Sequence, residues 1–454
     1  MIPGVTNAAK QEPRLSFYRL EWVTVVPNSA KACLSMPRTI AAILMTFMLA
    51  LSAAPAQSLD SATADDTARF LAGLPSSSSS ALAALTKEPA WQSHARYFDS
   101  IFAREESTHL SKVRSFAKKY LTDKHETMLY MFSGPDFLYA TSFFPNASTY
   151  VLAGLEPVGA VPDLAGLGSL VLNGELRNLE ASMGSLFNFS FFITQNMKTQ
   201  LRNGPVYGTL PVLYVFLART GKTIHAVDFV SLDEHGELQR DEAAVIADVM
   251  NTRTAASGVK IVFSEGNGPQ QTLYYFSTNL ADGSIERSGF SAFVAKLGPA
   301  DSLIKSASYL LHRSYFSSAR KLLLANSATI VQDDSGIPLG YFETTKWRLQ
   351  PFGRYAGPIP MFANFYQPRM AELFQSASPL EFGIGYQWRK NESNLLLAQR
   401  GSALSGDEMT AQAQPDASAA ESAAPSQKKT RRRVEGGGSP SLNCRIARVF
   451  PFCW

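Results

Sequence analysis

Acidic side chains in two parts of this sequence, residues 136–156 and residues 333–334, are of types and at positions that suit acid–base chemistry. One acid closes a Ser-Gly-Pro-Asp turn, and another directly follows an apolar run of strand length. A second pair is adjacent in the chain, so the two charges repel unless a cation, an arginine or solvent offsets them. Such carboxylates act as general acids and bases or as oxygen ligands of a divalent cation. The candidate catalytic residues are Asp136, Glu156, Asp333 and Asp334.

Polar residues close to these acids in the sequence are candidates for holding a ligand. Ser133 opens the turn, while Arg354 and Tyr355 lie in a Gly/Pro-rich stretch and suit an anionic or sugar-like ligand. An ordinary structural role competes at every position: a helix N-cap, a solvated turn, or an arginine bonded to loop carbonyls. A triad of Ser133, His312 and Asp334 can be written down, but no spacing in the sequence supports it.

Several motifs that would specify a chemistry are absent from the sequence. It contains no G-x-x-x-x-G-K-[ST], no G-x-G-x-x-G that opens a helix, no G-x-S-x-G and no H-E-x-x-H. The three cysteines, Cys33, Cys444 and Cys453, have no histidine or acid cluster beside them, although the last two can form a small disulfide loop. The sequence therefore predicts neither a cofactor nor a metal site.

The first acids are positioned by two short apolar runs with a helical segment between them. Met128–Phe132 and Thr149–Leu155 have strand character, and Phe137–Phe144 between them favours a short helix. This order predicts a βαβ unit, with a β-hairpin around Gly134-Pro135 as the competing interpretation. If the two strands are parallel, the acids that follow them meet at the carboxyl edge of the sheet, where ligands bind in open α/β sheets.

The remaining patterns alternate between helical and extended character. A helical layer at Trp91–Leu121 is expected to break near Glu105-Glu106-Ser107. Further helices are predicted at Glu175–Leu201, Pro211–Arg219, Phe290–Leu297, Leu303–His312 and Phe316–Ile330, with Ser314 as an N-cap. Further strands are predicted at Ile224–Leu232, Val259–Phe263 and Thr272–Phe276, the last two as a hairpin. The fold class is mixed α/β: a central mixed β-sheet packed by several helices, with an N-terminal helical layer.

An apolar run near the start of the chain has the features of a secretory signal peptide. Met36-Pro37-Arg38 supplies a start and a positive charge, Ile40–Leu51 is apolar, and Ala54-Pro55-Ala56 suits signal peptidase. Cleavage after Ala56 is expected, which makes residues 1–35 a non-native upstream extension and places the body in the periplasm or outside the cell. An uncleaved signal that anchors the chain is the alternative.

The amino-acid composition divides the rest of the chain into three segments. Residues 57–90 are expected to form a linker with short helices, 91–400 a single mixed α/β domain, and 401–454 a disordered tail poor in large apolar groups. The net charge of +4 is spread through the body, so no nucleic-acid partner is expected. The basic residues of the tail allow weak contact with an anionic membrane: Lys428, Lys429, Arg431, Arg432 and Arg433.

Four stretches of the sequence resemble a family of exported bacterial proteins that has no assigned function. They are FSGPDFLYATSFFPNASTYVLAGLEPVG (132–159), LRNLEASMGSLFNFSFF (176–192), IVQDDSGIPLGYF (330–342) and PFGRYAGPIPMF (351–362). The resemblance covers about residues 65–398 and implies an envelope or secreted location, with no catalytic residues to carry over. The first functional hypothesis is a non-catalytic periplasmic, envelope or ligand-binding protein. The second is a carboxylate-dependent hydrolase or lyase that acts on an envelope or extracellular substrate.

Overall fold

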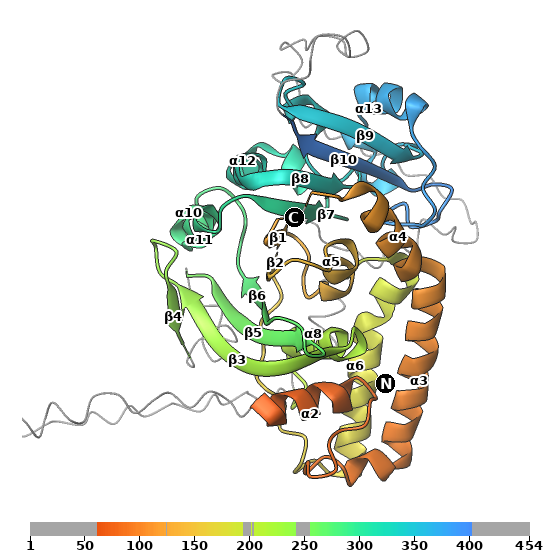
Figure 1. Cartoon of the computed structure of the whole chain (residues 1–454), viewed down its shortest axis with the longest axis vertical. Helices are drawn as coiled ribbons and strands as arrows, with labels where there is room; N and C mark the ends of the chain where they lie inside the picture. The colour runs from red at the N-terminus through yellow and green to blue at the C-terminus, as the bar shows by residue number, and fades with distance from the viewer. Residues whose placement is uncertain (1–60, 124, 194–200, 202–203, 242–254, 402–454) are drawn as a thin grey trace, which may run out of the picture. The chain divides into compact units, whose positions relative to one another are not determined.

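A single ten-stranded mixed sheet organises the chain in the computed structural model, which describes residues 61–123, 125–193, 201, 204–241 and 255–401 (Figure 1). The strand order is β4-β3-β5-β6-β2-β1-β7-β8-β10-β9. The strands are β1 Thr127–Tyr130, β2 Thr149–Gly154, β3 Lys222–Leu232, β4 Leu238–Arg240, β5 Ser257–Glu265, β6 Gln271–Ser277, β7 Ala300–Ile304, β8 Ser327–Gln332, β9 Trp347–Gly353 and β10 Asn394–Arg400. The mixed α/β fold class is confirmed.

The middle of the sheet is parallel and its two flanks are antiparallel. Strands β6, β2, β1, β7 and β8 run in one direction, whereas β5, β3 and β4 on one side and β10 and β9 on the other alternate in direction. From β1 the chain moves outward to β2 and β6, then returns to place β7 on the other side of β1. The strand order therefore reverses between β1 and β7, and such switch points open a crevice at the carboxyl ends of the strands.

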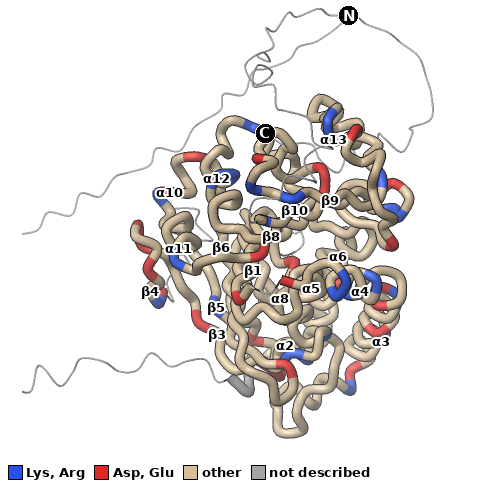
Figure 2. The backbone as a smooth tube through the Cα atoms, turned by 45° about the horizontal axis from the view of Figure 1, so that its top comes forward, with Lys and Arg blue, Asp and Glu red and all other residues tan. Residues whose placement is uncertain are grey.

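Helices cover both faces of the sheet because successive side chains of a strand point to opposite sides. Met128 and Tyr130 of β1 belong to one core cluster and Leu129 to the other. The first face carries α2 Ser61–Leu71, α3 Pro89–Glu105, α4 Ser111–Tyr120, α5 Phe137–Phe143, α6 Ser169–Phe189 and α8 Leu210–Arg219. The second carries α10 Ser284–Arg287, α11 Phe290–Lys296, α12 Ser317–Asn326 and α13 Pro368–Leu373 (Figure 1). Figure 2 shows basic and acidic residues interspersed along these elements.

Short 3₁₀ turns connect several of the elements. They are Leu85–Lys87, Leu310–His312, Ser314–Phe316, Leu339–Tyr341, Pro360–Phe365 and Phe374–Ser376. A π-helical turn at Glu106–Leu110 joins α3 to α4, at the break that the helical pattern predicted. Because π turns inside helices are frequent at functional sites, this junction is a place to look for chemistry.

The predicted βαβ unit is confirmed, and the hairpin around Gly134-Pro135 is excluded. β1 and β2 pair in parallel from Thr127 opposite Thr149, and α5 forms the crossover between them. The hairpin expected at residues 259–276 is also present, because β5 and β6 pair antiparallel across a tight connection. Asp136 is the N-cap of α5 and accepts the Tyr139 backbone N–H.

Three predicted helical segments are wrong in type or length. Residues 303–312 hold the end of strand β7 and a 3₁₀ turn, because the strand Ala300–Ile304 is paired on both sides within the sheet. The helix expected at 316–330 ends at Asn326, where strand β8 begins, and the N-cap of α12 is Phe316 rather than Ser314. Helix α6 ends at Phe189. The signal segment and the basic tail lie outside the described residues.

Candidate functional site

The carboxyl edge of the parallel strands brings together acids that are far apart in the sequence. Asp136 follows β1, Lys305 follows β7, and Asp333 and Asp334 follow β8. Asn394 is the first residue of antiparallel β10 and so lies beside the end of β8. We call these five residues the buried centre; each of them is at most 3% exposed.

Asp136 and Lys305 form a fully buried ion pair at the switch point between β1 and β7. The Lys305 Nζ lies 2.8 Å from Asp136 Oδ2, and the Tyr130 hydroxyl donates to the same oxygen at 2.9 Å. Lys305 also donates to the Ser190 carbonyl and lies 3.6 Å from the centre of the Tyr139 ring. Burial lowers the pKa of Lys305, and the Asp136 charge opposes that shift. Because the ammonium has an anion, a carbonyl and an aromatic face around it, its charge is compensated without water.

Asp333 is held by hydrogen-bond donors from two loops. Its carboxylate accepts the backbone N–H of Ser306 at 2.8 Å and that of Ser335 at 3.0 Å, together with the Ser335 hydroxyl. Burial, followed by the charge of Asp334, raises the pKa of Asp333 to about 7. Asp333 therefore changes its protonation near neutral pH, in the range that acid–base chemistry uses.

Asp334 binds different partners from its neighbour. The Tyr309 hydroxyl donates to one oxygen at 2.6 Å, and the Asn394 amide donates to the other at 3.2 Å. Burial raises the pKa of Asp334. The interpretation of Asp333 and Asp334 as a solvated turn is wrong, because the two side chains are only 1% and 2% exposed. Their repulsion is offset by separate hydrogen-bond networks and by proton uptake, and the described residues hold no cluster of acids, histidines or cysteines suited to a metal.

Backbone strain is concentrated around the buried centre. Among the described residues, the non-glycine residues with positive φ are Phe132 after β1, then Ser306, Ser308 and Tyr309 after β7, and Ser190 after α6. The residues Phe132, Ser306, Ser308 and Tyr309 belong to the two loops that meet at the switch point. Ser190 is the residue whose carbonyl accepts the hydrogen bond from Lys305. Such conformations cost about 1–3 kcal/mol each and cluster at functional sites.

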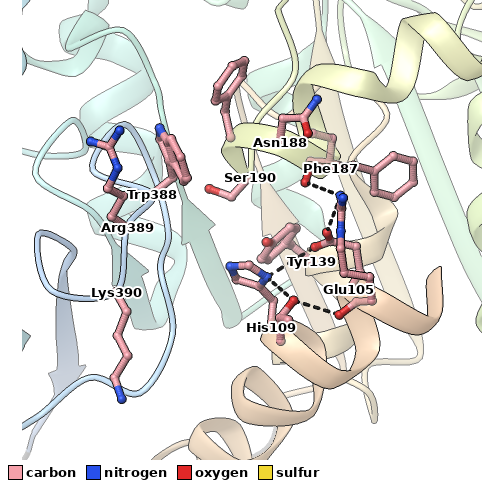
Figure 3. Close-up of a pocket in the computed structure, with 13 residues that line it drawn as sticks. Glu105, His109, Tyr139, Phe187, Asn188, Ser190, Trp388, Arg389 and Lys390 are labelled. Carbon is pink, nitrogen blue, oxygen red and sulfur yellow. Dashed lines mark hydrogen bonds and ion pairs between the residues drawn. The ribbon is translucent and has the colours of Figure 1, made fainter. Parts of the chain in front are cut away.

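A cavity of about 590 Å³ lies next to this centre (Figure 3). One wall comes from the end of α3 with the π turn and from the end of α6, and the opposite wall is the segment Trp388–Lys390. Figure 3 shows Tyr139 at the back of the space between the two walls. The lining residues are Arg104, Glu105, Thr108, His109, Tyr139, Leu186, Phe187, Asn188, Phe189, Ser190, Trp388, Arg389 and Lys390.

Glu105 and His109 are the titratable pair of this cavity. The π turn places them one above the other, with His109 Nδ1 3.5 Å from Glu105 Oε2, and Arg104 lies 3.3 Å from the other oxygen. Burial raises the pKa of Glu105 and lowers the pKa of His109. The Thr108 hydroxyl donates its single proton to the Arg104 carbonyl, so it accepts from His109 Nδ1 at 2.8 Å. In the neutral ring, Nε2 is therefore an acceptor that faces the cavity (Figure 3).

Two residues of the cavity lining also contact the buried centre. Tyr139 and Ser190 line the cavity, and both contact Lys305 from the other side. Ser190 Oγ also lies 3.4 Å from the Gly385 carbonyl, and a Cβ on Gly385 would come within 2.1 Å of Asp333 Oδ2. A ligand in the cavity would therefore rest on the residues that hold the ion pair.

The other predicted site residues lie at the edges of this arrangement or outside it. Glu156 is buried under Gly134 and accepts the Tyr275 hydroxyl through its backbone carbonyl at 2.8 Å, on the β6 side of the edge. The Ser133 hydroxyl is committed to the Gly134 carbonyl at 2.8 Å. Both positions follow their parallel strands as predicted, but Ser133 is bonded to neighbouring backbone and Glu156 to the Tyr275 hydroxyl.

The remaining two ligand-binding candidates, Tyr355 and Arg354, differ in burial. The Tyr355 hydroxyl accepts the Gln367 N–H at 2.9 Å; burial raises the pKa of Tyr355 to about 12, and the charge of Asp334 adds to the increase. Tyr355 therefore lies near the buried centre without contacting it. Arg354 is exposed, unlike the acids of the buried centre, and its backbone N–H donates to the Ser393 carbonyl at 2.8 Å.

Sequence reasoning missed the residues that give the site its character. Lys305 sits in a segment that was expected to be helical, and Trp388 is part of a loop-rich region. Glu105 and His109 were part of an amphipathic helical pattern, where the expected break was the one signal that marked them. No family model, no curated protein and no solved structure matches this chain. Its function therefore has to be argued from the geometry of the site.

Proposed function

We propose that this chain is a non-catalytic ligand-binding protein and that the cavity between α3, α6 and Trp388–Lys390 holds its ligand. The cavity itself carries the proposal. Its volume of about 590 Å³ falls within the range of small-molecule sites, and it lies beside the carboxyl edge of the parallel strands. Its walls combine aromatic rings with a few convergent polar groups, which is the composition that such sites use.

A screen with ligand-observed NMR and a small-molecule fragment library tests this function. Thr108→Trp fills the cavity with a large side chain, whereas Ser107→Trp places the same side chain on the same turn outside the lining. Both residues are exposed and both hydroxyls donate to the Arg104 carbonyl, which matches the two variants closely. Hits that bind the native chain and S107W but not T108W support the proposal. Hits that bind all three chains equally contradict it.

A carboxylate-dependent hydrolase or lyase is the second candidate, favoured by the meeting of three acids with Lys305 at the switch point. Its general acid–base residue would be Asp333, whose pKa of about 7 suits proton transfer at neutral pH. Against it, the acids are at most 2% exposed, so a substrate reaches them only if the layer formed by Ser190 and Gly385 opens. Turnover of chromogenic esters and glycosides that is lost in Asp333→Asn and kept in exposed Asp163→Asn would establish this activity.

We further propose that the body is exported, with residues 36–56 as the signal. Support comes from the sequence alone, because this segment lies outside the described residues. Within the described residues, no helix combines the length and apolar character that a bilayer crossing requires. N-terminal sequencing of the product after cell fractionation is expected to begin at Gln57. An intact Met1 on a cytoplasmic product would refute export.

A further inference from the structure

The charges around the cavity cancel, which bears on the kind of ligand it accepts. Each cationic side chain of the lining has a carboxylate partner. The pairs are Arg104 with Glu105, Arg389 with Glu392 at 3.4 Å, and Lys390 with Glu381 at 2.6 Å. Burial lowers the pKa of His109, which favours the uncharged ring. A ligand with a net charge would therefore enter a site that has no surplus countercharge for it.

Aromatic rings from both walls contact each other in the cavity lining. Trp388 and Phe189 lie with ring centres 5.6 Å apart and planes inclined by 62°, and Tyr139 closes the back. The faces of such rings are electron-rich and attract the polarised C–H groups of a ligand. Phe189 is 38% exposed, so part of this aromatic surface is open to a ligand.

Hydrogen-bonding groups of both kinds face the same space. Glu105 is almost fully buried, yet its nearest donor atoms lie 3.3 Å away on Arg104 and 3.5 Å away on His109. These distances are long for hydrogen bonds to a charged group. His109 Nε2 is a second acceptor, as derived above, and the exposed Asn188 amide offers both a donor and an acceptor. A ligand with several hydroxyl groups would satisfy these acceptors and receive bonds from the amide.

We propose that the cavity binds an uncharged saccharide, with Trp388 and Phe189 packed on its C–H face and Glu105 accepting one of its hydroxyl groups. This inference rests on the ligand-binding function proposed above and names the ligand class. Hydrolysis of the sugar is not part of it, because glycosidases use two carboxyl groups about 5–9.5 Å apart and Glu105 is the single acid among the described lining residues.

The test is isothermal titration of the full chain with neutral sugars, namely glucose, N-acetylglucosamine, maltose and cellobiose, and with the charged analogues glucosamine and glucuronate. At least one neutral sugar is expected to bind and to change the tryptophan fluorescence, and Trp388→Phe is expected to remove that change. Glu105→Gln is expected to weaken binding about ten-fold or more, since a charged acceptor is lost. Its control, Glu106→Gln, alters an exposed neighbour outside the lining and is expected to bind normally.

Three results would overturn the inference. In the first, the charged analogues bind as well as the matched neutral sugars. In the second, no sugar binds while fragments still bind in a way that T108W abolishes, which leaves the ligand-binding function standing and the ligand class wrong. If neither sugars nor fragments bind, the proposed function fails as well. Circular dichroism of E105Q and E106Q separates a loss of binding from a loss of folding.

Discussion

Replacing Lys305 by methionine tests whether the buried ion pair holds the carboxyl edge together. Methionine keeps most of the side-chain length and removes the charge, so Asp136 is left as an uncompensated buried anion. The partners are only 1% and 2% exposed, and 2.8 Å separates their charged atoms, so solvent cannot replace the lost ammonium. Removing one partner of such a pair costs about 3–5 kcal/mol. Domains of this kind are stable by about 5–15 kcal/mol, so K305M is expected to fold with much reduced stability.

The matched control is Lys222→Met. The Lys222 side chain is 3% exposed and so nearly as buried as that of Lys305, but its partner Glu265 is 67% exposed and remains solvated when the lysine is removed. The expected loss for K222M is therefore about 0–1 kcal/mol. The double variant K305M with Asp136→Asn removes both buried charges and keeps an N-cap residue for α5, so it is expected to be more stable than K305M alone.

Urea unfolding followed by circular dichroism is measured at one pH for five chains, namely the native chain, K305M, D136N, K222M and the double variant. The reasoning predicts a loss for K305M that exceeds the loss for K222M by at least about 2 kcal/mol, and a partial recovery in the double variant. Equal losses in K305M and K222M would refute it, because the burial of the partner would then make no difference. A double variant whose loss is the sum of the single losses would show that the two charges do not interact.

Three further predictions concern the same edge. In the folded chain Asp333 keeps a proton up to a higher pH than in the unfolded chain, because its pKa is raised from 3.8 to about 7. Its contribution to the free energy of unfolding is therefore complete below pH 3.8 and is lost as pH rises through about 7. At about 1.4 kcal/mol per pH unit over the two units from pH 5 to pH 7, urea unfolding should show a decline of about 3 kcal/mol between pH 5 and pH 8, and D333N should reduce that decline. Tyr309→Phe removes a 2.6 Å bond to Asp334 and is expected to cost about 1–3 kcal/mol by the same measurement. Gly385→Ala should destabilise the fold more than Gly221→Ala, since both glycines have φ near +74° but only Gly385 has Asp333 within 2.1 Å of the added Cβ; equal Tm values would contradict this.

The local order of elements could be predicted because it depends on neighbouring residues. The apolar runs at 128–132 and 149–155, with a turn and N-cap at Asp136 between them, predicted the parallel β1–α5–β2 unit that the structure has. The break near Glu105 was visible because the helical spacing of apolar residues changes there. These signals fall within windows of about ten to twenty residues, the range over which hydrophobic periodicity carries information.

The end of strand β7, Leu303 and Ile304, was expected to be helical because the apolar residues of 303–312 are too few to distinguish a helix from a strand by periodicity. What makes residues 300–304 a strand is pairing with β1 on one side and β8 on the other, which are distant in the chain. The burial of Asp333 and Asp334 was missed for a related reason. A pair of adjacent acids is usually solvated, and the donors that make their burial possible come partly from distant residues, namely Ser306, Tyr309 and Asn394.

By itself, the sequence determined the class of fold, the first parallel unit and the acids that follow its strands. The tertiary structure decided which of those acids meet. It brought Lys305 to Asp136 and left Arg354 at the surface, and it set Glu105 and His109 opposite Trp388 across one cavity. The physical reason is that a strand's neighbours in a sheet are chosen by the packing of both faces at once. No local stretch of the chain contains that information, whereas each helix and turn is favoured by its own residues.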